Sequence, residues 1–106
     1  MTQAELCAAL KSLGMPVAYG EFTQPTVPPF ITYQFNSNDD LFADNKNVIA
    51  VDTYLVELYV KFKDLAKEKL IQDKFKELNL PYSKTEEYLE SEKVRQVVYE
   101  IQLLGG

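Results

Sequence analysis

The sequence has no histidine and no tryptophan, and it contains a single cysteine, Cys7. Without histidine, the chain lacks the usual general base of enzymes and the commonest metal ligand. A single cysteine cannot form an intrachain disulfide, which excludes a disulfide-stapled secreted scaffold and favours synthesis in a reducing cytosol. We therefore expect no catalytic residue, no metal site and no cofactor, and a protein that is not an enzyme.

Basic residues are also in short supply. The 11 Lys and Arg residues are outnumbered by 16 Asp and Glu residues, which gives a net charge of −5. Nucleic-acid binding usually requires a basic face, so neither sequence-specific nucleic-acid binding nor adhesion to an anionic membrane is expected. The first residues do not form a signal-peptide pattern, and no apolar run approaches the ~18 residues of a membrane span. These features predict a soluble protein.

What the sequence does have is an ordinary hydrophobic content, 46 %, arranged with clear periodicity. The length suits a single domain, residues 1–106. Thr2 and Glu5 have the spacing of a capping box, and the apolar residues after them recur at helical spacing. We predict a helix over residues 2–13, which ends before Gly14.

A second helix is predicted over residues 65–78, with Asp64 as its N-cap. Its charged residues alternate in sign, and they are assigned to a solvated side that includes Glu68. Four apolar residues at helical spacing are predicted to form the buried stripe: Leu70, Ile71, Phe75 and Leu78.

Alternating apolar residues predict four strands, over residues 30–35, 48–62, 82–88 and 93–104. A short extended stretch that starts at Val17 can add a fifth strand. Connections within each strand pair are short enough for antiparallel hairpins. The predicted fold class is α+β, a four-stranded antiparallel sheet with two helices on one face, in the order α-β-β-α-β-β.

The strand over 48–62 is the strongest strand signal, and its two faces differ in character. One face is wholly apolar and is predicted to lie in the core: Tyr54, Val56, Leu58, Val60 and Phe62. The other face mixes apolar and polar residues, from Val51 through Leu55 and Tyr59 to Lys61. Because a fully solvated face would carry fewer apolar side chains, we expect this second face to be partly covered.

The stretch 36–47 is predicted to be a polar loop, although Leu41 and Phe42 lie in its middle. Asn36, Asn38 and Asp40 have the spacing of the first ligands of a calcium loop. Leu41 occupies the position where such a loop needs glycine, and the last ligand position lacks its glutamate, so metal binding is not expected. Solvation alone does not explain an apolar pair at this place.

Four carboxylates gather near the last predicted turn: Glu86, Glu87, Glu90 and Glu92. Such a group could serve acid–base catalysis or hold a cation. No pocket-forming glycine or aromatic motif accompanies it, and no nucleophile-elbow, P-loop or dinucleotide-binding motif is present in the chain. We interpret the group as surface charge.

Several hydrophobic-pattern motifs in residues 16–101 belong together. They are Pro29-Phe30 with its aromatic strand, Phe42-Ala43-Asp44-Asn45, Glu57-Leu58-Tyr59, a helix that starts at Lys63-Asp64, and a strand over 92–100 that ends in Tyr99-Glu100-Ile101. On these motifs the chain resembles small proteins encoded in the tail-morphogenesis region of siphophages and prophages of Gram-positive bacteria. That group resembles the tail-terminator, tail-completion or head–tail joining proteins.

The resemblance implies a structural protein that self-associates, commonly as a hexameric ring, and caps the tail tube or joins the tail to the head connector. It also implies tail-tube and head-connector proteins as partners, and a location in the host cytoplasm during assembly and then in the virion. An alternative is a small prophage-encoded binding module that acts on a host protein through the loop 36–47. Residues predicted to contact partners are Asp40, Leu41, Phe42, Asp44, Leu55 and Tyr59.

Overall fold

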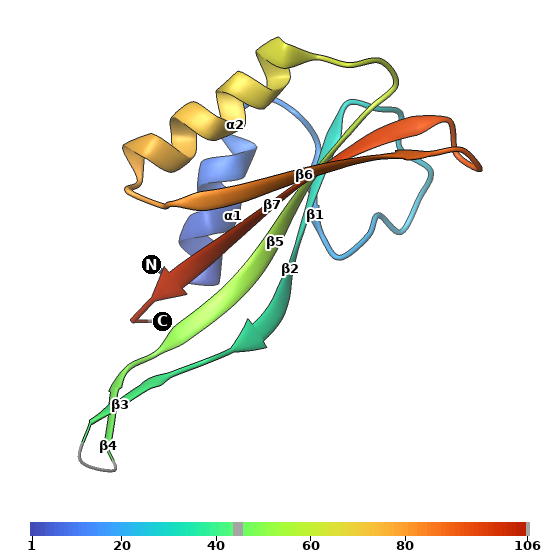
Figure 1. The fold of residues 1–106 in the computed structure, drawn as a ribbon. Coiled ribbons are helices and arrows are strands. Elements are labelled where there is room, and N and C mark those ends of the chain that lie inside the picture. Colours follow the sequence, from blue (N-terminus) through green and yellow to red (C-terminus); the bar gives the residue numbers. More distant parts are fainter. Residues whose placement is uncertain (44–45, 106) are drawn as a thin grey trace.

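The protein is described by a computed structural model that covers residues 1–43 and 46–105. A five-stranded sheet in the order β1-β2-β5-β7-β6 carries both helices on one face, and a separate two-stranded ribbon projects from one end (Figure 1). The elements in chain order are α1 (Gln3–Lys11), β1 (Val17–Tyr19), β2 (Phe30–Asn38), β3 (Leu41–Ala43), β4 (Lys46–Ile49), β5 (Val51–Val60), α2 (Leu65–Glu77), β6 (Tyr82–Leu89) and β7 (Val94–Leu104).

The predicted α+β class is confirmed, and the sheet differs from the prediction in one pairing. The short strand β1 joins the sheet as its fifth strand and pairs in parallel with β2, whereas all other neighbours in the sheet are antiparallel. The sheet is therefore mixed rather than wholly antiparallel. The loop 20–29 explains the difference, because it carries the chain back to the start of β1 before β2 begins.

The helices form for the reasons anticipated from the sequence. The Glu5 N–H donates to Thr2 Oγ1 at 3.2 Å and the Thr2 N–H donates to Glu5 Oε1 at 2.9 Å, which completes the capping box of α1. Asp64 caps α2 by accepting the Lys67 N–H at 3.1 Å. In the described residues, neither helix is long and apolar enough to cross a membrane.

The core lies between the helices and the inner face of the sheet. Strands β5 and β7 contribute the alternating residues that the sequence predicted, and the helices add Leu6, Leu10, Ile71 and Phe75. Two predicted core residues are exposed. Phe62 is 76 % exposed because β5 ends at Val60, and Leu70 points away from the sheet because the buried stripe of α2 is rotated.

The rotated stripe of α2 buries Glu68, although the charge pattern of the sequence predicts it on the solvated side. Only 1 % of Glu68 is exposed. Its Oε2 lies 2.7 Å from Lys63 Nζ and its Oε1 lies 2.5 Å from Lys84 Nζ. The two lysine ammonium groups therefore compensate the charge of the buried carboxylate.

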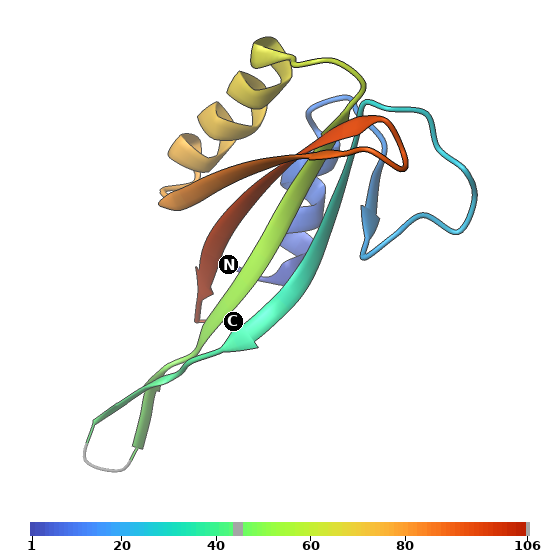
Figure 2. The same ribbon diagram turned by 45° about the vertical axis from the view of Figure 1, so that its right-hand side comes forward.

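The stretch 36–47 is not a simple loop, which corrects the prediction. Strand β2 continues through Asn38, and β3 and β4 then pair as an antiparallel ribbon before β5 begins. We call residues 39–50 the arm, of which Asp44 and Asn45 lie outside the described residues. Figure 2 shows the arm projecting beyond the sheet, and the molecule extends over 50 × 27 × 24 Å. Strand pairing satisfies backbone groups that a polar loop would leave to water.

Candidate functional site

The sheet face opposite the helices, called here the open face, is not covered by any described helix (Figure 1). The alternation of β5 places Leu55, Glu57 and Tyr59 on this face, opposite to Val56 and Leu58 in the core. Leu55 and Tyr59 are half-buried, as expected for a partly covered surface. Glu57 is only 7 % exposed, so a carboxylate lies buried in the middle of the open face.

Glu57 is held by polar side chains from the two strands beside β5. Its Oε1 accepts from Thr32 Oγ1 at 3.1 Å and from Gln34 Nε2 at 3.3 Å, and its Oε2 accepts from Gln96 Nε2 at 2.9 Å. Burial raises the pKa of Glu57, although the hydrogen bonds from Thr32 and Gln96 act in the opposite direction. A buried carboxyl group with a raised pKa therefore lies beneath the surface of the open face.

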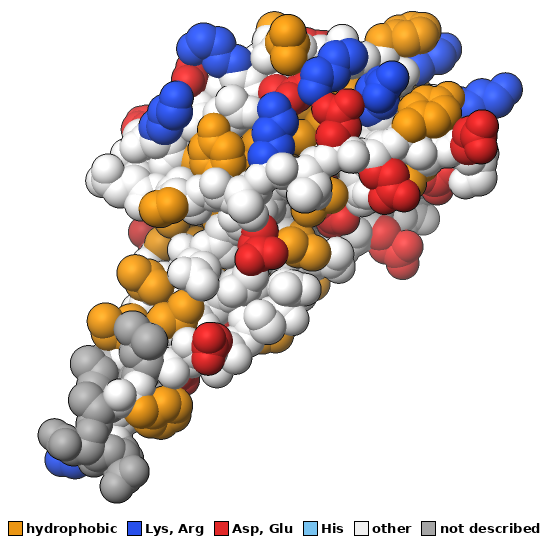
Figure 3. All heavy atoms as spheres, viewed as in Figure 1, with side chains coloured by type: hydrophobic (Ala, Val, Ile, Leu, Met, Phe, Trp, Pro, Cys, Tyr) orange, Lys and Arg blue, Asp and Glu red, His pale blue; other side chains and the backbone are white. Residues whose placement is uncertain are grey.

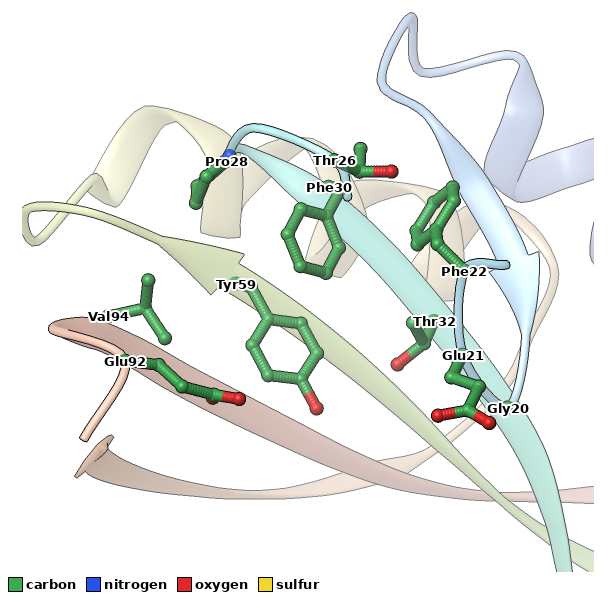
Figure 4. Close-up of a pocket in the computed structure, with 10 residues that line it drawn as sticks. All are labelled: Gly20, Glu21, Phe22, Thr26, Pro28, Phe30, Thr32, Tyr59, Glu92 and Val94. Carbon is green, nitrogen blue, oxygen red and sulfur yellow. The ribbon is translucent and has the colours of Figure 1, made fainter. Parts of the chain in front are cut away.

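One end of the open face is hollowed. A cavity of about 520 Å³ lies between the loop 20–29, the start of β2, the end of β5 and the turn from β6 to β7. We call it the aromatic hollow, because Phe22, Phe30 and Tyr59 line it (Figure 4). Glu21 and Glu92 also line it, and in Figure 4 their carboxylates lie on either side of the Tyr59 hydroxyl.

Phe30 contacts both other rings of the aromatic hollow. Phe30 and Tyr59 stack at a centroid distance of 4.9 Å, and Phe22 meets the Phe30 ring edge-on at 5.2 Å. The Tyr59 hydroxyl accepts from Gln96 Nε2 at 2.9 Å. Burial raises the pKa of Tyr59, and the carboxylates of Glu57 and Glu92 add to the shift. The hydroxyl therefore stays protonated and polar over the physiological range.

The predicted partner contacts on the arm have different environments. Asp40 lies at the base of the arm, where its Oδ1 accepts from Asn38 Nδ2 at 2.6 Å and from the Val51 N–H at 3.0 Å. Phe42 on β3 is 67 % exposed. The side chain of Leu41 and the whole of Asp44 lie outside the described residues. Asp40 therefore supports the arm, and Phe42 is presented by it.

The arm end of the molecule exposes more apolar surface than one side chain. Figure 3 shows hydrophobic side chains along this projecting end and basic side chains gathered at the opposite, helix-bearing end. Large hydrophobic residues exposed there are Phe35, Phe42, Ile49 and Leu104. Phe35 is exposed although the alternation of β2 places it on the same face as the buried Ile31 and Tyr33, because β2 continues beyond the cover of the helices before it reaches the arm.

The predicted contact residues therefore belong to two places. Leu55 and Tyr59 share the open face, whereas Asp40 and Phe42 lie at or beyond the start of β5. The aromatic hollow itself was not anticipated. Its signal in the sequence is the pair Phe22 and Phe30 on either side of a proline-rich loop, but only folding brings that loop to Tyr59.

Two acidic groups are candidate sites from the sequence: the four glutamates near the last turn and the calcium-like spacing of residues 36–40. The fold does not bring either group together as a site. Glu86 points to the helix side, where it pairs with Lys63 and Arg95, while Glu92 lines the aromatic hollow. Asn38 and Asp40 of the calcium-like spacing bond to each other. Within the described residues, no group of three or more potential ligand residues could hold a metal ion.

Comparison with known proteins adds no family to this description. No protein-family model matches the chain, and no curated protein matches it significantly.

Proposed function

We propose that this protein is a phage structural subunit that forms an oligomeric ring and either caps the tail tube or joins the tail to the head connector. The motif pattern of residues 16–101 motivates the proposal. The observation that carries it is the arm, a paired β-ribbon that presents the 67 % exposed Phe42 beyond the sheet. A monomer gains nothing from exposing a large aromatic side chain on a projecting ribbon.

The shape of the arm is compatible with ring formation. The arm end and the body are different surfaces, so an arm that docks on the body of one neighbour, while its own body receives the arm of another, makes a head-to-tail contact. Such contacts close into rings when the rotation between neighbours allows it. The exposed edge of the ribbon can also pair with a strand of a partner, and Phe42 then supplies the apolar anchor.

Light scattering coupled to size-exclusion chromatography tests the ring. We expect wild type to form an oligomer of defined mass over a concentration series, and Phe42→Ser to weaken association at least tenfold, roughly the effect of losing an apolar anchor. Phe62→Ser is the matched control, because Phe62 is also strongly exposed, at 76 %, but lies past the end of β5, whereas the arm precedes the start of that strand. A strict monomer that does not bind tail-tube protein would contradict the proposal.

Electron microscopy of particles assembled without the protein separates the two roles. Over-long tails indicate a terminator, because tube growth is then not stopped. Separate heads and tails indicate a joining protein.

The second candidate is a binding module that acts on a host protein, and the aromatic hollow favours it, since ring formation through the arm does not require this cavity. An affinity pull-down distinguishes the two candidates. Recovery of one host protein, lost in a variant of the hollow and absent from virions, would favour the binding module.

A further inference from the structure

The aromatic hollow has walls suited to a cation. Phe22, Phe30 and Tyr59 bring three electron-rich rings together, two of them stacked at 4.9 Å. An ammonium or guanidinium group placed over such rings is attracted by their quadrupoles, more strongly when the site excludes water. The loop 20–29 and the turn from β6 to β7 both wall the cavity, which partly shields it from solvent (Figure 4).

The charges of the aromatic hollow are all of one sign and are not compensated. Glu21 and Glu92 line it, no Lys or Arg does among the described residues, and neither carboxylate forms a salt bridge within the described part of the chain. The acids of the helix side behave differently, since Glu68, Asp73, Glu77 and Glu86 all have basic partners. In the hollow, negative charge therefore meets aromatic surface without a salt-bridge partner among the described residues.

Other classes of ligand fit this lining poorly. An anion would be repelled by the two carboxylates, and a purely apolar ligand would desolvate them without compensation. A metal ion is disfavoured because the described residues contain no suitable ligand group. A basic side chain suits both the aromatic walls and the carboxylates of the hollow, because its alkyl stem packs on the rings while its charged end reaches the carboxylates.

We propose that the aromatic hollow binds a lysine or arginine side chain of a protein partner. The backbone of the partner stays outside the open face and only the side chain enters. This inference does not depend on ring formation, because the hollow and the arm lie at opposite ends of β2 and β5.

Nuclear magnetic resonance titration tests the site with side-chain analogues. The probes are n-butylammonium and n-propylguanidinium, with butan-1-ol as the neutral control. We expect saturable shifts of the backbone amides at Gly20, Phe22, Phe30 and Val94 with both cations, weakened by added salt, and none of comparable size with butan-1-ol. Equal shifts with butan-1-ol would overturn the cation assignment.

Paired variants test the chemistry of the walls. Glu21→Gln with Glu92→Gln should weaken butylammonium binding roughly fivefold or more, and Phe22→Leu roughly threefold, from the usual size of ion-pair and cation–π contributions. Glu90→Gln is the matched control, because Glu90 is exposed in the same turn but does not line the hollow. The double variant changes only surface carboxylates, so its fold should persist. Unchanged binding in it would overturn the proposal.

Two peptides test whether the side chain can arrive on a polypeptide. Gly-Gly-Lys-Gly-Gly should produce the same shifts as butylammonium, and Gly-Gly-Gln-Gly-Gly should not. If butylammonium binds but the lysine peptide does not, the protein-partner assignment is wrong. Phe42→Ser should leave both titrations unchanged, so a failed ring and a failed hollow give different results.

Discussion

At the scale of single residues, Glu57 is the most unusual side chain of the protein. It is a carboxylate buried on a sheet face that no described helix covers, and its hydrogen-bond donors come from both neighbouring strands. A purely structural role could be filled by an amide or an apolar residue, since buried charge seldom adds net stability. Its position next to Tyr59 supplies negative potential to the aromatic hollow whenever it is ionised.

The raised pKa of Glu57 predicts a definite pH trend. Its pKa in the folded protein lies above the ordinary value of 4.5, so the folded state holds the proton more tightly than the unfolded state does. The stabilisation from the protonated form is complete below pH 4.5 and is lost as the pH rises through the folded pKa. The free energy of unfolding of Glu57→Gln, relative to wild type, should therefore increase between pH 4 and pH 7.

Urea unfolding at several pH values measures this difference. Glu100→Gln serves as the matched control, because Glu100 is an exposed glutamate on the neighbouring strand β7. A difference between Glu57→Gln and wild type that stays constant, or that decreases with pH, would show that Glu57 is not desolvated in solution.

At the scale of elements, the arm depends on a small polar cluster at its base. Asn38 Nδ2 donates to Asp40 Oδ1 at 2.6 Å, to Asp52 Oδ1 at 2.7 Å and to the Val51 carbonyl at 3.3 Å. One amide therefore connects the end of β2 to the start of β5. Two-stranded ribbons are marginally stable by themselves, so this connection determines how firmly the arm is held.

Removal of that amide should loosen the arm and spare the body. We expect Asn38→Ala to lower the global free energy of unfolding by less than about 1 kcal/mol, because the cluster is largely exposed. The free energy needed to open the arm locally should fall by a similar amount, so cleavage of the arm should become roughly fivefold faster. Trypsin reports the arm selectively, since Lys46 is the only basic residue between Lys11 and Lys61.

Cleavage after Lys46 is followed by mass spectrometry of the two fragments. Ser37→Ala is the control, because Ser37 is an exposed neighbour on the same strand. Equal cleavage rates in Asn38→Ala and wild type would mean that strand pairing alone holds the arm.

At the scale of the whole molecule, the contacts around Glu68 connect elements that are distant in the sequence. Lys63 follows β5, Glu68 belongs to α2, and Lys84 belongs to β6. Lys63 also pairs with Glu86, which in turn contacts Arg95 on β7. Because β6 is an edge strand, this network helps to attach the edge of the sheet to the helix layer.

The network predicts acid sensitivity. Burial alone would raise the pKa of Glu68, but the ammonium groups of Lys63 and Lys84 outweigh it and lower the pKa below 4.5. The stabilisation by Glu68 is therefore present above pH 4.5 and is lost as the pH falls through its folded pKa. Glu68→Gln should destabilise the protein by about 1–3 kcal/mol at pH 7, less than for a fully buried pair because both lysines are partly exposed.

Thermal unfolding at pH 7 and pH 2.5 checks this prediction. The difference in melting temperature between Glu68→Gln and wild type should shrink at the lower pH, where the wild-type carboxylate is protonated. Glu77→Gln is the control, since Glu77 pairs with Lys74 on the exposed surface of the same helix. A difference that is the same at both pH values would point to packing rather than charge.

The sequence by itself determined the local elements and the residues that form most of the core. Helical spacing with caps at Thr2 and Asp64, and the two-residue alternation of β5 and β7, are properties of neighbours along the chain, so they can be recognised without the fold. The exposed Phe42 was also identifiable, because an apolar residue within a polar stretch has no local explanation.

Only the tertiary structure decided the parallel pairing of β1, the burial of Glu68 and the existence of the aromatic hollow. Each depends on which segments meet in space. The rotation of α2 is set by packing against the whole sheet, and it buries Glu68 where two lysines from other elements can compensate the charge. The hollow joins Phe22, Tyr59 and Glu92 from three distant segments, and the spacing of these residues along the chain contains no information about their distance in the fold.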